Sequence, residues 1–591
     1  MSLKRWNILL LVSSLSVCAT CLSISSNQSP LFQGHSNATG LENDGIQVGK
    51  VISDELSTFV KRMTEMWEVK GTTIAVVRPG GEIEFGSWGI KSEDGEKMTP
   101  ETLLNIASCS KAFLASTMGI LMHDFQRGRN QTSLPTVNSF SWSTKVKDVL
   151  PDEWELQDCW ANEKVDILDI LSHRSGMPRH DGSNGPKDTA RDVVKRLKYL
   201  RPAYEPRQKF AYNNQMFVTG AHIISKYSPM HNYPDFVKER IFTPLGMKST
   251  TFSPKAASDG GNLTQSWTAH SRRIPFAYSD SSVDMIAGAG GIITNVVDLS
   301  RWIQVLLNKG VDPISNETII PRPVFNIVTT AHTLMNGNPR LQESSIVAYG
   351  MGWWRRSFKG HEMIQHTGGI PGFSSSVCFF PNDGFGIAIL MNSGDKEAVN
   401  EAIQLRIAED VLGLERTRRA ENPKTAQPKQ PTYNASSPVP FIAYAGTYRN
   451  PGYGSVTFCA PSSTSEYCSD VLDAFKVVDN AQSAPLPPDS TVPQLYAKWE
   501  RFWSTHVRLV HVEETTFKVA LTTLFLKGYG TNKKPFETFE MDEYKGEVKF
   551  VLDGKGENVE GFGFFGIGDD RRALGDAQGI KESSIAWFEK V

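Results

Sequence analysis

Cysteine is scarce in this chain of 591 residues, which has seven. Cys18 and Cys21 lie close to the N-terminus, and the five that follow form no CxxC pair and no His/Cys cluster with the spacing of metal ligands. The sequence therefore implies no structural zinc, no other metal and no cofactor. An odd number of later cysteines leaves at least one thiol unpaired unless a bridge forms between chains.

The sequence also lacks a concentration of charge of one sign. Its 62 lysines and arginines are spread among 64 aspartates and glutamates, and the formal net charge is −2. Proteins that bind nucleic acid need a basic patch or stripe, so nucleic acid is excluded as an expected partner. The chain is too long for one compact core, and two domains are expected.

No apolar run reaches the roughly 20 residues that a membrane-spanning helix needs. The run over residues 8–17 is preceded by Lys4 and Arg5 and followed by small residues, with Ala19 at the last position before a cleavage site. Residues 1–19 are therefore predicted to be the signal peptide of a secreted, extracellular protein with no stable membrane span. A signal anchor is the alternative.

Residues 20–48 are rich in Ser, Asn and Gly and are predicted to be disordered. Six Asn-x-Ser/Thr triplets are candidate sites of N-linked glycosylation, which supports a secreted glycoprotein. Some such triplets arise by chance in a chain rich in Asn and Ser, so they do not decide the location. The six asparagines are Asn27, Asn37, Asn130, Asn262, Asn316 and Asn434.

Residues 49–418 are predicted to form the first domain. Segments with strand character stand at both ends, and segments with helical periodicity lie between them, which describes an α/β sheet whose ends meet plus a helical lobe. The elements expected are a helix in 52–69, a hairpin in 71–90, mostly helices over 105–310 with one at 295–310, strands at 374–381 and 385–392, and a helix at 396–413.

A Pro-rich polar stretch, 419–440, is predicted to be a linker. In residues 441–591, short segments rich in Val, Phe, Tyr and Thr alternate with turns of Gly, Asn and Asp, which predicts an antiparallel all-β domain, either barrel-like or sandwich-like. Cys459 and Cys468 lie close together in the sequence and flank a Ser/Pro-rich loop. They are the predicted disulfide pair.

The stretch "NIASCSKAFLASTMGILMHDF" places Ser108 and Lys111 before an apolar helix. Residues three apart lie on the same helix face, so the amine of Lys111 can reach the Ser108 hydroxyl. This geometry suits Ser108 as a nucleophile and Lys111 as its base. A lysine with its ordinary pKa of about 10.4 is charged at neutral pH, so burial or a neighbouring cation must lower it. The Ser-x-x-Lys pattern alone is weak: it recurs at Ser393 and Lys396, and Ser108 as a mere helix cap is the alternative.

Two further patterns follow in order along the chain. Tyr212-Asn213-Asn214 begins another apolar helix, and His366-Thr367-Gly368 is a turn of small residues that leads into a strand. Together with Ser108-x-x-Lys111, this set resembles the serine β-lactamase and penicillin-binding-protein superfamily, nearest the class C β-lactamases and their esterase and D-aminopeptidase relatives. The stretches "ILDILSHRSGMPRHD", "GAGGIITNVVDLSRW" and "YGMGWW" are also similar to that family.

The resemblance covers about residues 51–415 and implies a β-lactamase/transpeptidase-like fold, an antiparallel sheet flanked by helices. The β-rich segment after the linker resembles modules attached to fungal-type relatives. The implied roles are Ser108 as the acylated nucleophile, Lys111 and Tyr212 as the pair that moves its proton, and Asn214 as the residue that holds Lys111.

The third motif supplies the rest of the implied site. Backbone N–H groups of Ser108 and Gly369 would form the oxyanion hole, with Thr367 and Gly368 beside it. His366 stands where many penicillin-recognising relatives carry lysine. With a pKa near 6.5, a histidine is only partly charged at neutral pH, so it would anchor the carboxylate of a β-lactam poorly. The resemblance therefore favours ester or amide hydrolysis.

The other polar residues have ordinary structural explanations. His173, His180, His231 and His270 are expected to be loop or core histidines, since none lies in a metal pattern. Asp166 and Asp169 are expected to mark a helix start rather than a catalytic pair.

The function predicted from the sequence is that of a secreted serine hydrolase. It would act on a small ester, amide or peptide-like substrate through an acyl-enzyme on Ser108. Acyltransferase, transpeptidase-like or β-lactamase activity with the same site is one alternative. A catalytically inactive scaffold or binding protein is the other.

Overall fold

The computed structural model describes residues 50–130, 139–417, 436–481, 492–539, 546–565 and 579–591. The predicted signal peptide, the predicted disordered segment and most of the predicted linker lie outside these residues. So do Cys18, Cys21 and the sequons at Asn27, Asn37 and Asn434. The predicted domain boundary at residues 418–441 falls largely in the same undescribed stretch and stays a prediction. Within the described residues, no helix is long and apolar enough to cross a membrane.

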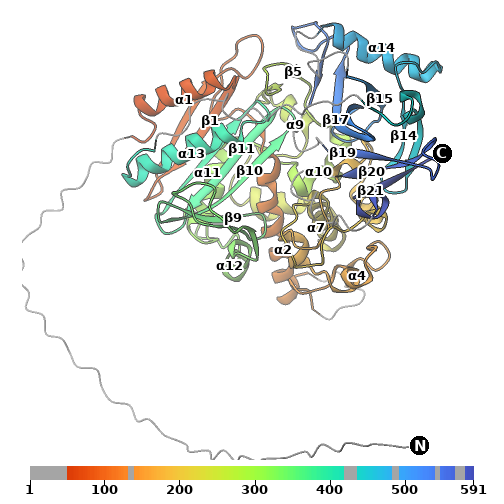
Figure 1. Ribbon diagram of the computed structural model, residues 1–591. Coiled ribbons are helices and arrows are strands. Elements are labelled where there is room, and N and C mark those ends of the chain that lie inside the picture. The colour runs from red at the N-terminus through yellow and green to blue at the C-terminus, as the bar shows by residue number, and fades with distance from the viewer. Residues whose placement is uncertain (1–49, 131–138, 418–435, 482–491, 540–545, 566–578) are drawn as a thin grey trace, which may run out of the picture. The chain divides into compact units, whose positions relative to one another are not determined.

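The first sheet has eight strands, and every neighbouring pair is antiparallel. The hairpin predicted near the N-terminus is present, and it pairs with the last strand of the sheet, so the two ends of the domain meet as predicted (Figure 1). The strands, in spatial order, are β2 (Ile83–Gly89), β1 (Gly71–Val77), β12 (Phe385–Met391), β11 (Phe373–Phe380), β10 (His361–Ile370), β9 (Trp354–Phe358), β8 (Val347–Tyr349) and β7 (Thr333–Asn336).

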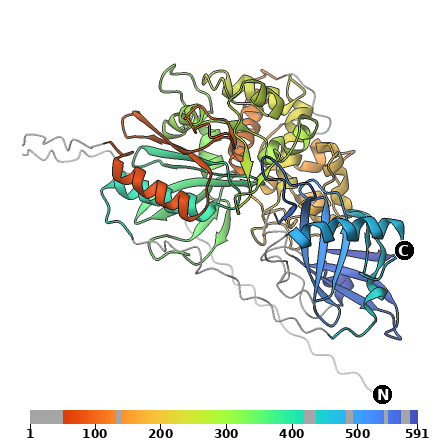
Figure 2. The same ribbon diagram turned by 90° about the horizontal axis from the view of Figure 1, so that it is seen from above.

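Helices cover both faces of this sheet (Figures 1 and 2). Successive residues of β1 alternate between two apolar clusters because side chains of a strand point to opposite faces. Ile74 packs with α1 (Asp54–Met66) and α13 (Glu397–Leu412), whereas Ala75 packs with the cluster that contains α2 (Ser110–Gln126). The α/β prediction for this part of the chain is therefore confirmed.

The helical lobe is also present. The helix predicted at 295–310 is α11 (Val296–Leu307), capped by Asn295, whose side chain accepts from the N–H of Asp298. The other lobe helices are α3 (Val146–Val149), α4 (Cys159–Lys164), α5 (Ile167–Leu171), α6 (Ala190–Arg196), α7 (Asn214–Tyr227), α8 (Tyr233–Val237), α9 (Pro254–Asp259), α10 (Val283–Gly290) and α12 (Arg322–Thr329). Two short antiparallel pairs lie among them: β3 (Leu104–Asn105) pairs with β6 (Ile293–Thr294), which is distant in the sequence, and β4 (Ser266–Trp267) forms a hairpin with β5 (Arg273–Ile274).

A second antiparallel sheet, of nine strands, follows residue 436. Its edge strands β14 and β15 meet where Cys459 and Tyr496 exchange backbone hydrogen bonds of 2.7 and 3.0 Å, so the sheet closes almost into a barrel. The order is β14 (Gly454–Phe458), β13 (Gly446–Asn450), β21 (Ala586–Lys590), β20 (Val559–Phe565), β19 (Glu547–Leu552), β17 (Thr516–Phe525), β16 (His506–Glu513) and β15 (Gln494–Lys498), with β18 (Phe536–Thr538) paired to β17. Of the two predicted forms, the barrel is the one observed.

The second sheet carries a long helix that the all-β prediction missed, α14 (Glu466–Ala481). Cys468, Val471, Phe475 and Val478 form its buried face at helical spacing. The predicted disulfide between Cys459 and Cys468 is confirmed, with Cα atoms 5.4 Å apart, and it ties the start of α14 to the end of β14.

Candidate active site

Ser108 lies in a single turn of 3₁₀-helix, η1 (Ala107–Cys109), which runs directly into α2. The residue before it, Ala107, has a φ of +45°, a conformation that residues other than glycine seldom adopt. Its N–H donates to the side-chain oxygen of Asn105 at 2.6 Å, and Asn105 in turn donates to the carbonyl of Gly290 at 3.2 Å. The turn that presents Ser108 is thus held by a strained residue and a buried side chain.

Two proton-carrying side chains meet at the Ser108 hydroxyl. Lys111 Nζ lies 3.0 Å from Ser108 Oγ, and Tyr212 Oη lies 2.9 Å from the same atom. Lys111 is fully buried and also donates to Asn214 Oδ1 at 2.8 Å and to the carbonyl of Ala289 at 2.7 Å. Four residues predicted from two separate motifs are therefore in direct contact, as a nucleophile and its proton carriers require.

Burial controls the protonation of this group. Loss of hydration, followed by the positive charge of Arg179, holds the pKa of Lys111 well below its ordinary value of 10.5. Burial also raises the pKa of Tyr212 above its ordinary value of 10, so its hydroxyl keeps its proton. A lowered pKa favours the neutral amine, which is the form that can take the proton of Ser108, and the protonated Tyr212 hydroxyl beside it can act as an acid.

Cys109 does not compete with Ser108 as a nucleophile. Burial raises the pKa of its thiol to about 12, and its Sγ lies 3.2 Å from the carbonyl of His366. A thiol that stays protonated at neutral pH reacts poorly. Cys109 instead packs the turn of Ser108 against β10.

The third predicted motif lies inside strand β10, next to the turn of Ser108, so the expectation of a turn at residues 366–368 is wrong. Strand β9 pairs with β10 only from His361 to Gln365, so in the described sheet β10 runs on to Ile370 beside β11 alone. A Cβ at Gly368 would lie 2.2 Å from the Ile106 carbonyl oxygen, and only glycine permits this approach. Thr367 and Gly369 are half-exposed, whereas Gly368 is buried. The roles predicted for Thr367, Gly368 and Gly369 in binding an oxyanion or substrate stay predictions.

His366 differs from the sequence expectation in its charge. It is 1 % exposed, its Nε2 lies 3.0 Å from Tyr349 Oη and its Nδ1 lies 2.6 Å from the Thr367 carbonyl oxygen. Burial lowers the pKa of His366 from 6.5 to about 3. The expectation of a partly charged ring at neutral pH is therefore wrong, because that expectation used the pKa of a hydrated imidazole.

Two residues of the site carry no motif of their own, Arg179 and Asp181. The Arg179 guanidinium lies 4.8 Å from the centre of the Tyr212 ring, and Asn214 Nδ2 donates to Asp181 Oδ2 at 2.7 Å. Both residues lie in the stretch "ILDILSHRSGMPRHD" that carried the family resemblance. That stretch was the available signal, but it did not show which of its side chains face Lys111.

The second Ser-x-x-Lys has a structural role. Lys396 Nζ donates to the carbonyls of Trp67 and Ala269 at 2.6 and 2.9 Å, and Ser393 Oγ accepts from the N–H of Lys70 at 3.1 Å. The lysine therefore ties together three chain segments, and within the described residues it makes no hydrogen bond to Ser393 Oγ. This contrast separates the pattern at Ser108 from its repeat.

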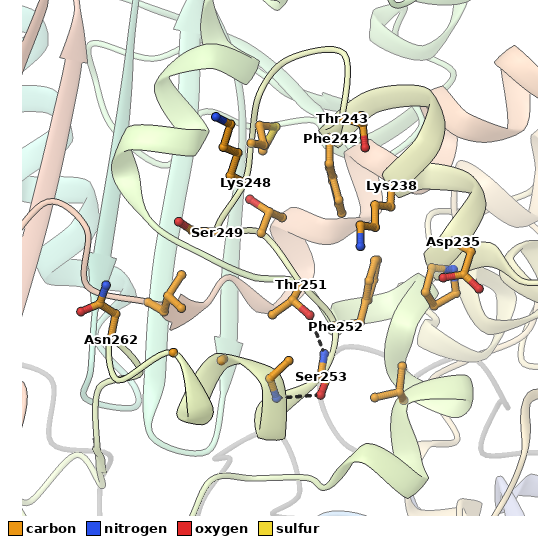
Figure 3. Close-up of a pocket in the computed structure, with 18 of the residues that line it drawn as sticks. Asp235, Lys238, Phe242, Thr243, Lys248, Ser249, Thr251, Phe252, Ser253 and Asn262 are labelled. Atoms are coloured by element: carbon orange, nitrogen blue, oxygen red, sulfur yellow. Dashed lines mark hydrogen bonds between the residues drawn. The ribbon is translucent and has the colours of Figure 1, made fainter.

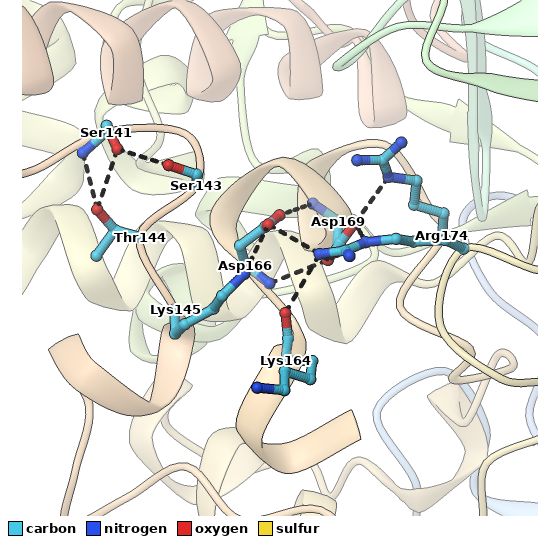
Figure 4. A network of polar contacts seen from close by, with 9 residues as sticks. Ser141, Ser143, Thr144, Lys145, Lys164, Asp166, Asp169 and Arg174 are labelled. Atoms are coloured by element: carbon cyan, nitrogen blue, oxygen red, sulfur yellow. Dashed lines mark hydrogen bonds and ion pairs between the residues drawn. The ribbon is translucent and has the colours of Figure 1, made fainter. Parts of the chain in front are cut away.

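Asp166 and Asp169 mark the start of α5, as predicted. The two carboxylates form a reciprocal capping box, and Figure 4 shows their ion pairs with Lys145 and Arg174. Of the four histidines, His231 and His270 are exposed, and His173 and His180 are buried.

The large pocket in Figure 3, with a volume of about 850 Å³, is separate from this group. Its walls come from α8, α9 and the turns around them, and its labelled side chains include Lys238, Lys248 and Asn262. None of its lining residues belongs to the group around Ser108.

The fold and the group around Ser108 are those of a β-lactamase-like serine hydrolase. The family model Beta-lactamase matches residues 59–411, which is more than half of the chain, and the chain belongs to this family. It is 27% identical over 439 residues to the unguisins hydrolase ungD' of Aspergillus campestris, covering 69% of this chain and 78% of that protein.

Two further proteins are similar to this chain. Penicillin-binding protein 4* of Bacillus subtilis is 26% identical over 378 residues, covering 60% of this chain and 75% of that protein. The octameric penicillin-binding protein homologue from Pyrococcus abyssi has a similar fold, with a TM-score of 0.51 and 18% identity over 84% of this chain and 96% of that one.

Proposed function

We propose that this protein is a secreted hydrolase that cleaves an amide or ester bond through an acyl-enzyme on Ser108. The observation that carries the proposal is the Ser108 hydroxyl, which lies 3.0 Å from a buried lysine amine and 2.9 Å from a partly buried tyrosine hydroxyl. Two relatives named as unguisins hydrolases support hydrolysis as the reaction.

The first half of the reaction transfers the acyl group. Neutral Lys111 accepts the Ser108 proton as Oγ attacks the substrate carbonyl, and N–H groups of Ser108 and Gly369 stabilise the oxyanion that forms. When the tetrahedral intermediate collapses, the carbon–nitrogen or carbon–oxygen bond breaks. Tyr212 gives its proton to the leaving amine or alcohol and regains one from Lys111, which leaves Lys111 neutral and Ser108 esterified.

The second half returns the enzyme to its starting state. Water attacks the ester carbonyl and loses a proton to the Lys111–Tyr212 pair, and Ser108 Oγ takes that proton as it leaves. The products are a carboxylic acid and the free enzyme. An amine or alcohol in place of water would make the same site an acyltransferase. Measuring the ratio of products with and without an added nucleophile tests this alternative.

The neutral His366 bears on substrate choice. Many relatives that recognise penicillin carry a lysine at this position, with a permanent ammonium, whereas a ring with a pKa of about 3 supplies no charge there. We therefore place β-lactams behind esters and peptide-like amides as substrates. A panel of p-nitrophenyl esters, D-amino amides and a chromogenic β-lactam tests this order.

Secretion is part of the proposal. A positively charged N-terminal segment followed by an apolar run supports it, as does the disulfide between Cys459 and Cys468, since such bonds persist in oxidising compartments. Expression of the full-length chain in a secreting host, with N-terminal sequencing of protein from the medium, tests it. Protein retained in the cell with residues 1–19 intact would contradict it.

The experiment that tests the chemistry is labelling with a fluorophosphonate probe, followed by intact-mass measurement. Wild type is expected to gain one adduct, Ser108→Ala none, and Lys111→Met an adduct formed about 100-fold or more slowly. Ser393→Ala, which changes the serine of the other Ser-x-x-Lys, is the matched control and is expected to label like wild type. Folded wild type that gains no adduct would favour an inactive scaffold instead.

A further inference from the structure

A short loop connects the group around Ser108 to the second sheet. It runs from His180 to Asn184, and His180, Asp181, Ser183 and Asn184 are all buried. On one side Asp181 accepts from Asn214, the residue that contacts Lys111. On the other side the loop contacts residues of the second sheet and its connections.

Asp181 determines which way the Asn214 amide points. A carboxylate only accepts hydrogen bonds, so the group that faces Asp181 Oδ2 at 2.7 Å must be the NH₂ of Asn214. The amide oxygen then faces Lys111 Nζ at 2.8 Å. If the amide were reversed, its oxygen would face the carboxylate and that contact would be lost, while its NH₂ would compete with the Ser108 hydroxyl for the lone pair of the neutral Lys111 amine.

The loop is held from the second sheet by Tyr453. Its hydroxyl lies 2.8 Å from His180 Nδ1, and His180 Nε2 lies 2.9 Å from the carbonyl of Arg201. A carbonyl only accepts, so neutral His180 donates through Nε2 and its Nδ1 accepts from the tyrosine. Tyr453 is 2 % exposed, and nearby the N–H of Phe502 donates to the Asn184 carbonyl at 2.9 Å.

From these contacts we propose that Asp181 is a positioning residue that orients Asn214 and through it Lys111, and that the second sheet holds Asp181 in place through Tyr453. The proposal rests on the proposed function, because it assigns Asp181 its effect through Lys111 as the base for Ser108. Tyr453 then helps to position the catalytic lysine, although it supplies no group that touches the substrate.

Charge and orientation predict opposite effects for loss of the Asp181 carboxylate. Asp181 raises the pKa of Lys111, whereas Arg179 lowers it, so removing the carboxylate charge favours the neutral lysine. A purely electrostatic role would therefore leave the rate at neutral pH unchanged or faster. An orienting role makes the rate fall, because the side chain of an asparagine at 181 accepts and donates and no longer specifies the Asn214 amide.

The first test measures the acylation rate by the fluorophosphonate probe and steady-state kinetics on the best ester. Asp181→Asn is expected to lower the acylation rate and kcat about 10- to 100-fold, the loss of one buried charge-assisted hydrogen bond, with little change in KM. Asn214→Ala should lower the same rates. The double variant should be no slower than Asn214→Ala, because Asp181 acts through Asn214.

The second test compares two buried tyrosines of the second sheet. Tyr453→Phe removes the hydroxyl that His180 accepts from and is expected to lower kcat about 3- to 10-fold. Tyr448→Phe is the matched control: its hydroxyl donates at 2.8 Å to the carbonyl of Tyr444, in the 3₁₀-helix that precedes β13, and it should keep the wild-type kcat. Thermal unfolding of both variants shows whether each is folded at the assay temperature.

The outcomes separate this inference from the proposed function. If wild type is labelled and Asp181→Asn is labelled at the same rate, the positioning role of Asp181 is overturned, and Ser108 remains the nucleophile. Equal kcat values for Tyr453→Phe and Tyr448→Phe overturn the role of the second sheet. If Asp181→Asn does not fold, this comparison of the two tyrosines is the deciding test. Wild type without an adduct overturns the proposed function and this inference together.

Discussion

At the scale of single residues, buried histidines make the stability of this protein sensitive to acid. Burial lowers the pKa of His366 to about 3 and that of His180 to about 4, and it holds that of His173 well below 6.5. Because these values are depressed in the folded state, the unfolded chain takes up the protons first. Their contribution to stability is complete above pH 6.5 and is lost as pH falls toward each folded pKa, by about 1.4 kcal/mol per pH unit for each histidine.

Urea unfolding of wild type and His366→Gln between about pH 7.5 and pH 4.5 measures this effect. Below pH 6.5, the free energy of unfolding should fall more steeply with pH for wild type than for the variant. The difference between the two slopes should approach the slope contributed by one histidine. His231→Gln, which changes an exposed histidine, should keep the wild-type slope. Parallel curves for wild type and His366→Gln would show that His366 titrates normally in the folded protein.

The residues that meet at Ser108 were predictable to different degrees. Ser108, Lys111, Tyr212 and Asn214 belong to ordered motifs, and the structure brings them into contact. The charge of His366 was not predictable, because a pKa depends on burial that a one-dimensional pattern does not contain. Asp181 was not predictable either, since its effect arises from a loop that meets α7 only in the folded chain.

At the scale of secondary structure, the contact between β10 and η1 depends on Gly368. An alanine there would place its Cβ 2.2 Å from the Ile106 carbonyl oxygen and 2.4 Å from Ser375 Oγ, so strand and turn must separate. Gly368→Ala is expected to slow labelling of Ser108 about 100-fold, because a small displacement of a nucleophile costs that much. Gly337→Ala, whose Cβ would lie 3.7 Å from its nearest neighbour, is the control.

Labelling kinetics and thermal unfolding of both glycine variants distinguish two effects. A displaced nucleophile slows labelling even at temperatures where Gly368→Ala is fully folded. A variant that labels at the wild-type rate would show that β10 can move away without moving Ser108.

The disulfide at the start of α14 stabilises the second sheet. It closes a loop with a sequence separation of 9, and restricting so short a loop in the unfolded chain contributes about 2–3 kcal/mol. The double variant Cys459→Ser, Cys468→Ser should therefore unfold at lower denaturant concentration by that free energy. An unchanged midpoint of denaturant unfolding under non-reducing conditions would indicate that the bond contributes nothing. Cys159→Ser, which changes an exposed free cysteine, is the control for the substitution itself.

The elements themselves were more predictable than their arrangement. Strand β1 follows from a β-branched run before a turn, and β11 and β12 follow from apolar segments with strand character. Helix α14 was missed although its buried residues have helical spacing, because the β-rich segments around it dominated the prediction. The near closure of the second sheet at Cys459 and Tyr496 joins strands whose pairing no local pattern specifies.

At the scale of the whole molecule, the described residues 436–591 and the helical lobe share buried contacts, such as that of Tyr453 with His180. Arg201 donates to the carbonyls of Lys581 and Glu582 at 2.9 and 2.8 Å, which adds a second connection. A linker in the sequence suggests independent domains, whereas such contacts couple them. This coupling was not predictable, because composition locates a boundary but does not show which surfaces meet.

The folded surface also decides which sequons can carry glycans if the protein is secreted. Asn262 and Asn316 are exposed, whereas Asn130 is 7 % exposed and its Nδ2 donates to the Tyr227 carbonyl at 2.8 Å. A glycan replaces a hydrogen on that nitrogen and would have to displace the packed side chains around it. Protein secreted from a eukaryotic host is therefore expected to be glycosylated at Asn262 and Asn316 and not at Asn130.

Peptide mapping before and after removal of N-glycans by an amidase tests this expectation, since the amidase converts each occupied Asn to Asp. Asn262→Gln and Asn316→Gln should each shift the intact mass by one glycan, and Asn130→Gln should leave the glycan mass unchanged. Because Asn130 also makes a buried hydrogen bond, its variant should instead lose stability by about 1 kcal/mol. A glycan on Asn130 of active, secreted protein would mean that this side chain is exposed in solution and that the contact with Tyr227 does not form.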